Sequence, residues 1–340
     1  MIALSRSFIA AAATLALLAA AAGAATPPRP APVASSPIPV IFDCDIGGDI
    51  DDTWALIMLL KSPRLDVRLI TTDQGDTVYR AKIVARLLEI AGRTDIPIGI
   101  GIRENENEGA QAEWVRGYDL KDFPGTVHED GVQSLIDTAM ASEETLTLIA
   151  VGPAPNIAAA LEREPRIAGR LRFSGMYGSL RRGYGGAAKP HAEWNVRANV
   201  PAARRLLGAP WADAISTPLD TCGVVELKGD RYARVRDSKD PLLQALMENY
   251  RLWCERVPWC ADESGQVEVK SSTLFDTVAV YLAEARDLVK TEKLGVRVND
   301  QGMTVIDEAA PALAWATEWK NLDGFEELLV ERLTGAGVPD

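Results

Sequence analysis

The feature that most constrains this chain is a short apolar run followed at once by five carboxylates within ten residues. The run Pro39–Phe42 predicts a buried strand, and Thr53–Leu60 predicts a helix, so the acidic stretch Asp43–Asp52 lies in a strand-to-helix loop. In an open α/β sheet such a loop stands at the carboxyl end of a strand, where ligands bind. The sequence therefore predicts a functional site in this loop.

The density of acid in this loop indicates a metal site. Five like charges in one turn repel one another, and a bound divalent cation relieves that repulsion. Because the carboxylates offer only oxygen ligands, the pattern favours a hard ion, Ca²⁺ or Mg²⁺. The alternative is a solvated acidic loop whose acids stabilise the N-terminus of the next helix. Asp43 and Asp45 favour the metal site, since they directly follow a buried strand, where an unpaired charge is costly.

Two other known arrangements share features with the same stretch. An EF-hand loop does not fit, because Gly47 stands at the third ligand position and Trp54 at the twelfth, where that loop needs a bidentate Glu. A strand followed by Asp-x-Asp also resembles the haloacid dehalogenase-type phosphatases, which would make Asp43 a nucleophile and Asp45 an acid. That family carries Thr or Val where Gly47 stands here. A magnesium-dependent phosphohydrolase is therefore a second hypothesis.

The acidic loop resembles more closely the opening motif of the nucleoside hydrolases, Asp-x-Asp-Pro-Gly-x-Asp-Asp-Ala. The stretch Asp43–Thr53 departs from it by carrying Ile46 for the Pro and Thr53 for the Ala, and by two additional residues between Gly47 and Asp51. Asp49 belongs to this insertion, and the resemblance gives it no role.

Three later stretches resemble motifs of the same family and follow in the same order. Gly152–Ala158 is similar to Gly-Pro-Leu-Thr-Asn-Ile-Ala, Glu193–Asn195 is similar to Glu-Phe-Asn, and Phe275-Asp276 stands where the family carries His-Asp. The resemblance runs from about residue 38 to about residue 318. This ordering of four separated motifs is far more specific than any single match.

The alternation of strand and helix patterns predicts an α/β fold. Strand patterns at Val67–Thr72, Leu146–Val151 and Leu171–Met176 alternate with helical patterns such as Val78–Ala91. Three short strand patterns between residues 296 and 316 predict a small antiparallel annexe. We therefore expect a Rossmann-like, mostly parallel sheet flanked by helices, with this annexe at the C-terminus.

The resemblance implies a role for each matching residue. The ligands of a Ca²⁺ ion would be Asp45, Asp52, Asp276 and the backbone carbonyl of Val151. Asp45 would also be catalytic, as the base that takes a proton from water. The sugar would be bound by Asp51, Asp76, Glu193 and Asn195. Asp43 is expected behind the ligands, where it orients the loop.

One departure concerns protonation of the leaving base. Phe275 replaces the His that performs this step in many relatives, and a phenyl ring neither donates nor accepts a proton. The two histidines of the chain are His128 and His191, so the proton would come from one of these, from another acid, or not at all. Stacking of the base on Trp194 or Trp253 is a further means of activating it.

The N-terminal stretch predicts a secretory signal peptide over residues 1–24. It holds one charged residue, Arg6, followed by the alanine-rich run Phe8–Ala22 and a small-residue cleavage site at Ala22–Ala24. A membrane anchor is the alternative, but the strongly apolar part is shorter than the roughly 20 residues that a span requires. We expect a periplasmic or secreted protein without membrane contact after cleavage.

Composition agrees with one large domain that binds a small molecule. Residues 25–37, with five prolines, predict an extended linker, and residues 38–336 predict a single domain. The apolar content of 47% is enough for its core. A net charge of −12 without a basic stripe argues against nucleic-acid polymers as partners and is compatible with a neutral nucleoside.

The cysteines fit an oxidising compartment. Cys254 and Cys260 are six residues apart, and we expect a local disulfide between them. Cys44 lies between two acids, which raise the pKa of a thiol, so a thiolate nucleophile is not expected there.

Together these features predict a secreted, Ca²⁺-dependent N-ribohydrolase that releases base and ribose from purine or pyrimidine ribonucleosides. The resemblance also implies a homodimer or homotetramer. A phosphohydrolase that uses Asp43 and Asp45 is one alternative. A nucleoside or sugar binder that has lost turnover is another, which the replacement by Phe275 permits.

Overall fold

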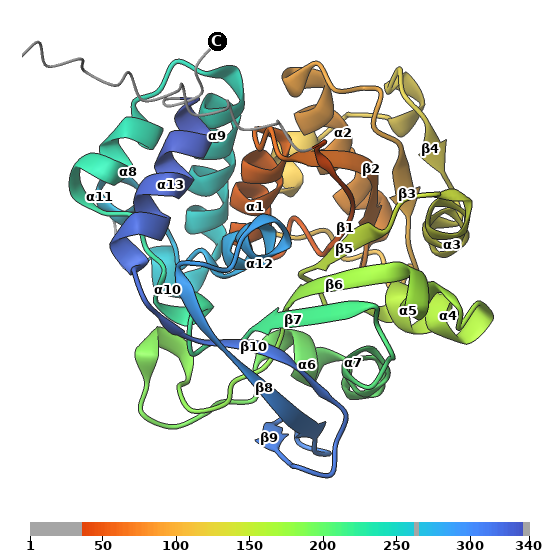
Figure 1. Cartoon of the computed structure of the whole chain (residues 1–340). Helices are drawn as coiled ribbons and strands as arrows, with labels where there is room; N and C mark the ends of the chain where they lie inside the picture. Colours follow the sequence, from red (N-terminus) through yellow and green to blue (C-terminus); the bar gives the residue numbers. More distant parts are fainter. Residues whose placement is uncertain (1–35, 262–264, 336–340) are drawn as a thin grey trace, which may run out of the picture. The chain divides into compact units, whose positions relative to one another are not determined.

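The computed structural model describes residues 36–261 and 265–335, which form a ten-stranded sheet with helices on both faces (Figure 1). The predicted signal peptide and most of the predicted linker lie outside these residues. The strands are β1 (Ile38–Cys44), β2 (Leu65–Thr72), β3 (Ile98–Ile100), β4 (Val127–His128), β5 (Leu146–Ala150), β6 (Leu171–Met176), β7 (Asp213–Thr217), β8 (Val289–Val298), β9 (Thr304–Ile306) and β10 (Ala312–Trp319).

The strand order places the acidic loop at a switch in topology. The order is β4-β3-β2-β1-β5-β6-β7-β10-β8-β9, so β1 pairs in parallel with β2 on one side and with β5 on the other. The chain thus leaves β1 in one direction and resumes at β5 in the other. In open parallel sheets, the crevice at the carboxyl ends of such a strand pair is the usual ligand site.

Helices cover the two faces of the sheet unequally. The longer helices are α1 (Asp51–Leu60), α2 (Thr77–Ala91), α3 (Gly131–Ala141), α4 (Pro155–Arg163), α7 (Val200–Leu207), α8 (Gly229–Arg236), α9 (Pro241–Arg256), α12 (Phe275–Glu284) and α13 (Leu322–Thr334). The shorter ones are α5 (Ile167–Arg170), α6 (Trp194–Ala198), α10 (Pro258–Ala261), α11 (Gln266–Val269) and the 3₁₀ turns 112–115, 120–122, 184–186 and 222–224. One hydrophobic core lies under α1, α2, α8, α9, α12 and α13, and the other under α3, α4, α5 and α7 (Figure 1).

The strand β1 shows why the sheet forms as the sequence predicts. Val40 and Phe42 are buried in one core and Ile41 in the other, because successive side chains of a strand point to opposite faces. A strand that is apolar on both faces is stable only between two layers of helices. The predicted α/β fold is therefore confirmed.

The predicted antiparallel annexe is present and is continuous with the main sheet. β8 pairs antiparallel with both β9 and β10, as expected. β10 also pairs in parallel with β7, through Ala314 and Trp315. Trp315 is fully buried, so the annexe extends the same core.

No helix among the described residues is long and apolar enough to cross a bilayer.

The cysteines behave as expected. Cys254, in α9, and Cys260, in α10, form a disulfide bond. Cys44 is buried, and burial together with the nearby carboxylate of Asp52 raises the pKa of its thiol well above the ordinary value. This environment keeps the Cys44 thiol protonated and does not favour a thiolate nucleophile, as predicted.

Candidate active site

The loop after β1 is shaped by Gly47, which directs the acids into a cavity. Gly47 has φ of +98°, a region that side chains with a Cβ rarely adopt. A Cβ there would lie 2.7 Å from Ile83 Cδ1 and 2.8 Å from the Tyr79 ring. Tyr79 Oη donates a hydrogen bond to the Gly47 carbonyl at 3.1 Å. The close packing against α2 therefore requires glycine at this turn.

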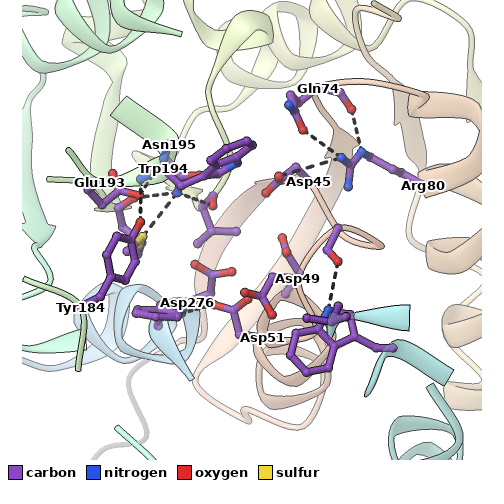
Figure 2. Close-up of a pocket in the computed structure, with 17 residues that line it drawn as sticks. Asp45, Asp49, Asp51, Gln74, Arg80, Tyr184, Glu193, Trp194, Asn195 and Asp276 are labelled. Carbon is purple, nitrogen blue, oxygen red and sulfur yellow. Dashed lines mark hydrogen bonds and ion pairs between the residues drawn. The ribbon is translucent and has the colours of Figure 1, made fainter. Parts of the chain in front are cut away.

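The acids line a cavity of about 350 Å³ at the carboxyl ends of the central strands (Figure 2). Its floor is formed by Asp45, Asp49, Asp51, Asp52 and Asp276, and its aromatic wall by Tyr184, Trp194, Trp253 and Phe275. The remaining lining residues are Gly48, Gln74, Arg80, Val151, Met176, Glu193, Asn195 and Val257. The four motifs that are far apart in the sequence thus meet in one place.

Three buried carboxylates form a candidate metal centre. Asp51, Asp52 and Asp276 each place an oxygen within 4.8 Å of the other two. Burial is the largest influence on all three carboxyls, and together with repulsion from other carboxylates of the cavity it raises their pKa values well above the ordinary range. Asp52 Oδ1 is buried and accepts no hydrogen bond from the protein. This donor set fits a hard divalent cation, which would hold the carboxylates ionised.

Asp49, in the two-residue insertion, adds a further acid to this floor. Its Oδ1 accepts a hydrogen bond from the Ile50 backbone amide at 2.6 Å. The residue is exposed at the cavity surface, and desolvation of its carboxyl raises the pKa to about 6. The insertion therefore places extra negative charge directly beside Asp51.

Asp45 stands at the edge of this centre next to a buried cation. Arg80 Nη2 lies 3.9 Å from Asp45 Oδ2. Burial raises the pKa of the Asp45 carboxyl, and the Arg80 charge opposes that rise. Arg80 is fixed by hydrogen bonds to the carbonyls of Gln74, at 2.7 Å, and Ile46, at 2.8 Å. Asp45 is thus a buried carboxylate with a raised pKa, and carboxylates whose pKa values are raised in this way serve as general bases.

The carbonyl of Val151 and the amide of Asn195 belong to the same wall. Asn195 Nδ2 donates hydrogen bonds to the Val151 carbonyl at 2.8 Å and to the Met176 carbonyl at 3.0 Å. Its Oδ1 is thereby oriented away from these carbonyls. Because a carbonyl oxygen has two lone pairs, the Val151 carbonyl can accept this bond and still ligate a cation.

Glu193 lines the cavity and also caps α6. Its carboxylate accepts hydrogen bonds from the backbone amides of Gly178 (3.0 Å), Asn195 (2.7 Å) and Val196 (3.2 Å). Burial is the largest influence on this carboxyl and raises its pKa to about 7, while the three amides act in the opposite direction. The residue predicted to bind sugar therefore also fixes the start of α6, the helix that carries Asn195.

Asp76, which was predicted to bind the sugar, does not line the cavity. It caps α2, where its Oδ1 accepts from the amides of Val78 and Tyr79. Arg103 Nη2 forms an ion pair with Asp76 Oδ2 at 3.0 Å. Both oxygens are thus engaged in holding the chain, and Gln74 lines the cavity from this loop instead.

Asp43 lies behind the acidic loop, as expected for an orienting residue. It is fully buried and does not line the cavity. Its Oδ2 accepts from Thr71 Oγ1 at 2.5 Å and from Asn156 Nδ2 at 2.9 Å. A phosphohydrolase would need Asp43 exposed to substrate as a nucleophile, so this alternative is not favoured.

Neither histidine of the chain lines the cavity. His128 lies in β4 at the edge of the sheet. His191 is closer, since its Nδ1 accepts a hydrogen bond from the Tyr184 backbone amide at 3.3 Å. Phe275 does line the cavity, and both Trp194 and Trp253 are in the wall, as a stacking role requires.

Gln74, Arg80 and Tyr184 are cavity residues that motif comparison missed. Gln74 has a φ of 60°, which is an uncommon backbone conformation for a residue other than glycine. The residue type gives no signal of this conformation. Arg80 is one of many arginines on helices. Tyr184 stands in a glycine-rich loop, where an isolated aromatic residue was the available signal.

Comparison with known proteins gives a consistent result at the level of sequence families. The model of the family described as inosine-uridine preferring nucleoside hydrolase matches residues 40–327. This match begins in β1 and ends in α13, so it includes every residue of the cavity.

Individual relatives cover nearly the same span. A pyrimidine-specific ribonucleoside hydrolase of Citrobacter koseri is 28% identical over 316 residues, which are 87% of this chain and 98% of that protein. A probable uridine nucleosidase of Arabidopsis thaliana is 26% identical over 277 residues, 78% of this chain and 83% of the relative.

Solved structures share the fold. A plant nucleoside hydrolase has a TM-score of 0.72 at 23% identity and covers 88% of this chain and 99% of that one. A purine-preferring ribonucleoside hydrolase from Gardnerella vaginalis has a TM-score of 0.68 at 22% identity and covers 87% and 98%. The described sheet and its C-terminal strands therefore have the architecture of these enzymes.

Proposed function

Because the chain belongs to the inosine-uridine preferring nucleoside hydrolase family, whose members cleave N-glycosidic bonds with a metal ion, we propose that it is a Ca²⁺-dependent hydrolase of purine or pyrimidine ribonucleosides. The observation that carries the proposal is the buried cluster of Asp51, Asp52 and Asp276 on the floor of a cavity that Asp45 also lines. Carboxylate and carbonyl oxygens are the ligands that Ca²⁺ prefers.

In this proposal the ion is held by Asp45, Asp52, Asp276 and the Val151 carbonyl. A bound Ca²⁺ would supply positive charge that lowers the pKa of a water molecule and anchors sugar hydroxyls. Asp45 accepts the proton of the attacking water, since it lines the cavity beside the carboxylate cluster and burial raises the pKa of its carboxyl.

The sugar is bound by groups around this centre. Asp51 accepts a hydrogen bond from one ribose hydroxyl, and its place among the three clustered carboxylates also allows it to contact the ion. Asn195 offers its Oδ1, because its amide hydrogens are committed to backbone carbonyls. Glu193 binds at the same wall. The predicted contact of Asp76 would require a shift of the α2 N-terminus, so we assign that contact to Gln74.

The floor also stabilises the transition state electrostatically. Cleavage of an N-ribosidic bond passes through a sugar with oxocarbenium character, in which positive charge develops at the anomeric carbon. Fixed carboxylates in a buried cavity stabilise that charge more strongly than water does.

Assay of a nucleoside panel tests the proposed activity. Purified protein with Ca²⁺ should release base and free ribose in equal amounts from one or more of inosine, adenosine, uridine and cytidine. The control substrate p-nitrophenyl phosphate should release no phosphate. Absence of ribose from every nucleoside, with the protein folded, would refute the activity, and phosphate release would support the phosphohydrolase instead.

We further propose that the protein is exported and assembles as a homodimer or homotetramer. The disulfide between Cys254 and Cys260 supports export, because such bonds persist in oxidising compartments. Fractionation of expressing cells should recover the mature chain, without residues 1–24, outside the cytoplasm.

Light scattering of the purified protein should give two or four times the mass of one chain, and a single-chain mass would reject the assembly.

A further inference from the structure

The cavity has a polar floor and an aromatic mouth, which orients the substrate. Asp51 and Asp276 are 4% and 3% exposed, whereas Tyr184 and Trp194 are 38% and 47% exposed. A ribose held by the floor carboxylates therefore projects its base toward the aromatic residues. Phe275 stands in that wall and supplies no hydrogen-bond donor, so the donor for a departing base must come from elsewhere.

Tyr184 carries a hydroxyl at this mouth. Its ring meets Phe275 edge to face, with ring centroids 5.8 Å apart and an interplanar angle of 85°. Its Oη accepts a hydrogen bond from the Trp194 backbone amide at 2.8 Å. That bond uses a lone pair and not the phenolic hydrogen, so the hydroxyl retains its capacity to donate.

Apart from the exposed Trp194 indole, which also stands at the mouth, the other side-chain donors of the cavity are committed or stand elsewhere. The Asn195 amide donates to the Val151 and Met176 carbonyls, and the Trp253 indole donates to the Gly48 carbonyl at 3.2 Å. Gln74 and Arg80 lie on the side of the cavity opposite Tyr184 (Figure 2).

The loop that carries Tyr184 is fixed by His191. The Tyr184 backbone amide donates to His191 Nδ1, and the two rings lie 5.8 Å apart. The His191 amide in turn donates to Ser179 Oγ at 3.0 Å. His191 is thus a positioning residue for the tyrosine and does not itself line the cavity.

We propose that the Tyr184 hydroxyl donates a hydrogen bond to the leaving base, in the role that Phe275 cannot fill; this inference rests on the proposed nucleoside hydrolysis. The bond from C1′ of the ribose to the base nitrogen breaks, and its electron pair goes to the base. The water oxygen bonds to C1′ and its proton passes to Asp45. The Tyr184 hydrogen bond stabilises the negative charge on the base, which then takes a proton from solvent as Asp45 returns one to solvent.

A tyrosine suits hydrogen-bond donation better than full proton transfer here. Burial is the largest influence on the phenol and raises its pKa above the ordinary value. The hydroxyl therefore stays protonated across the physiological range, and its effect depends on how much charge the leaving group develops.

Substitution of Tyr184→Phe, which removes the hydroxyl alone, tests the role. Rates are compared on the wild type's best natural nucleoside and on p-nitrophenyl riboside, whose leaving group departs without help. We expect kcat/KM to fall about 10²-fold on the nucleoside, the scale for loss of one transition-state donor, and by less than about threefold on the nitrophenyl substrate. Tyr118→Phe, outside the cavity, is the matched control and should change neither rate.

The second part of the test restores a hydrogen-bond donor to the cavity. Phe275→His added to Tyr184→Phe should recover part of the lost nucleoside rate, because a donor again faces the leaving base. Equal losses on both substrates, or no loss on either, would overturn the role of Tyr184. If the wild type cleaves neither substrate, the proposed function itself fails, which separates the two outcomes.

Discussion

At the scale of single residues, the cavity gathers four buried aspartates and the exposed Asp49 near one guanidinium. Arg80 compensates part of the charge beside Asp45, and a divalent cation would compensate most of the remainder. The carboxylates therefore differ in the charged groups around them. Substitutions that keep the shape of one side chain but remove its charge separate their roles.

Asp45→Asn removes the proton acceptor and keeps the shape of the side chain. We expect kcat to fall by about 10² or more, because general base catalysis contributes on that scale, while KM changes less. Steady-state kinetics on a nucleoside measure both. The exposed Asp137→Asn serves as the control, and a variant of Asp45 with unchanged kcat would remove this residue from the reaction.

Phe275→His introduces an acid next to the leaving base. We expect it to raise the rate on natural nucleosides and to leave p-nitrophenyl riboside nearly unchanged, since nitrophenolate needs no proton to leave. The wild type should cleave p-nitrophenyl riboside much faster than inosine or uridine. Equal wild-type rates on the two substrate types would show that leaving-group activation is already complete.

Single residues also show that a sequence motif predicts the position of a residue better than the direction of its side chain. Asp43, Asp45, Asp52 and Asp276 lie where the motifs indicate, because they are tied to strand ends and helix starts. Asp76 likewise stands directly before a helix, α2, yet its carboxylate is turned to the α2 backbone and Arg103. The direction of a loop side chain depends on local backbone angles and on partners distant in sequence, which a motif does not specify.

Among the elements, the disulfide between α9 and α10 lies next to the cavity wall. Cys254 directly follows Trp253, and the closed loop contains Val257; both of these neighbours line the cavity. The bond thus holds part of the cavity wall.

Removal of this bond by Cys254→Ser with Cys260→Ser should lower the free energy of unfolding by about 2 kcal/mol, the loop-closure value for a loop of this length. We also expect KM for nucleosides to rise more than kcat falls. Urea unfolding and steady-state kinetics provide the two measurements. Unchanged KM would show that the wall keeps its shape without the bond.

The elements were predictable in different degrees. Strand β1 and helix α1 follow from the apolar run and the helical spacing around the acidic loop. The parallel pairing of β10 with β7 was not predicted, since a short apolar strand carries no signal for the direction of its distant partner.

For the whole molecule, the buried acids make stability depend on pH and on the metal ion. Burial raises the pKa of Glu193 from 4.5 to about 7, and those of Asp51, Asp52 and Asp276 are also raised. In this pH range the folded protein binds more protons than the unfolded chain, so stability decreases as pH rises.

Metal-free protein should therefore unfold at progressively lower temperature as pH rises from about 4.5 to about 7. Ca²⁺ should reverse this trend near neutral pH, because it binds ionised carboxylates of the folded state. Thermal unfolding with EDTA and with Ca²⁺, at matched ionic strength, measures the effect. A metal-free melting temperature that increases over this window would contradict the assignment of raised pKa values.

The most direct test of the account is titration of Ca²⁺ into EDTA-stripped, dialysed protein while ribose release from a nucleoside is measured. We predict no activity before addition and a rise that saturates at about one Ca²⁺ per chain, with Asp52→Ala folded but neither binding the ion nor active. Full activity in the stripped wild-type protein, or restoration by Zn²⁺ and not by Ca²⁺, would contradict a calcium-dependent N-ribohydrolase built on the acidic loop.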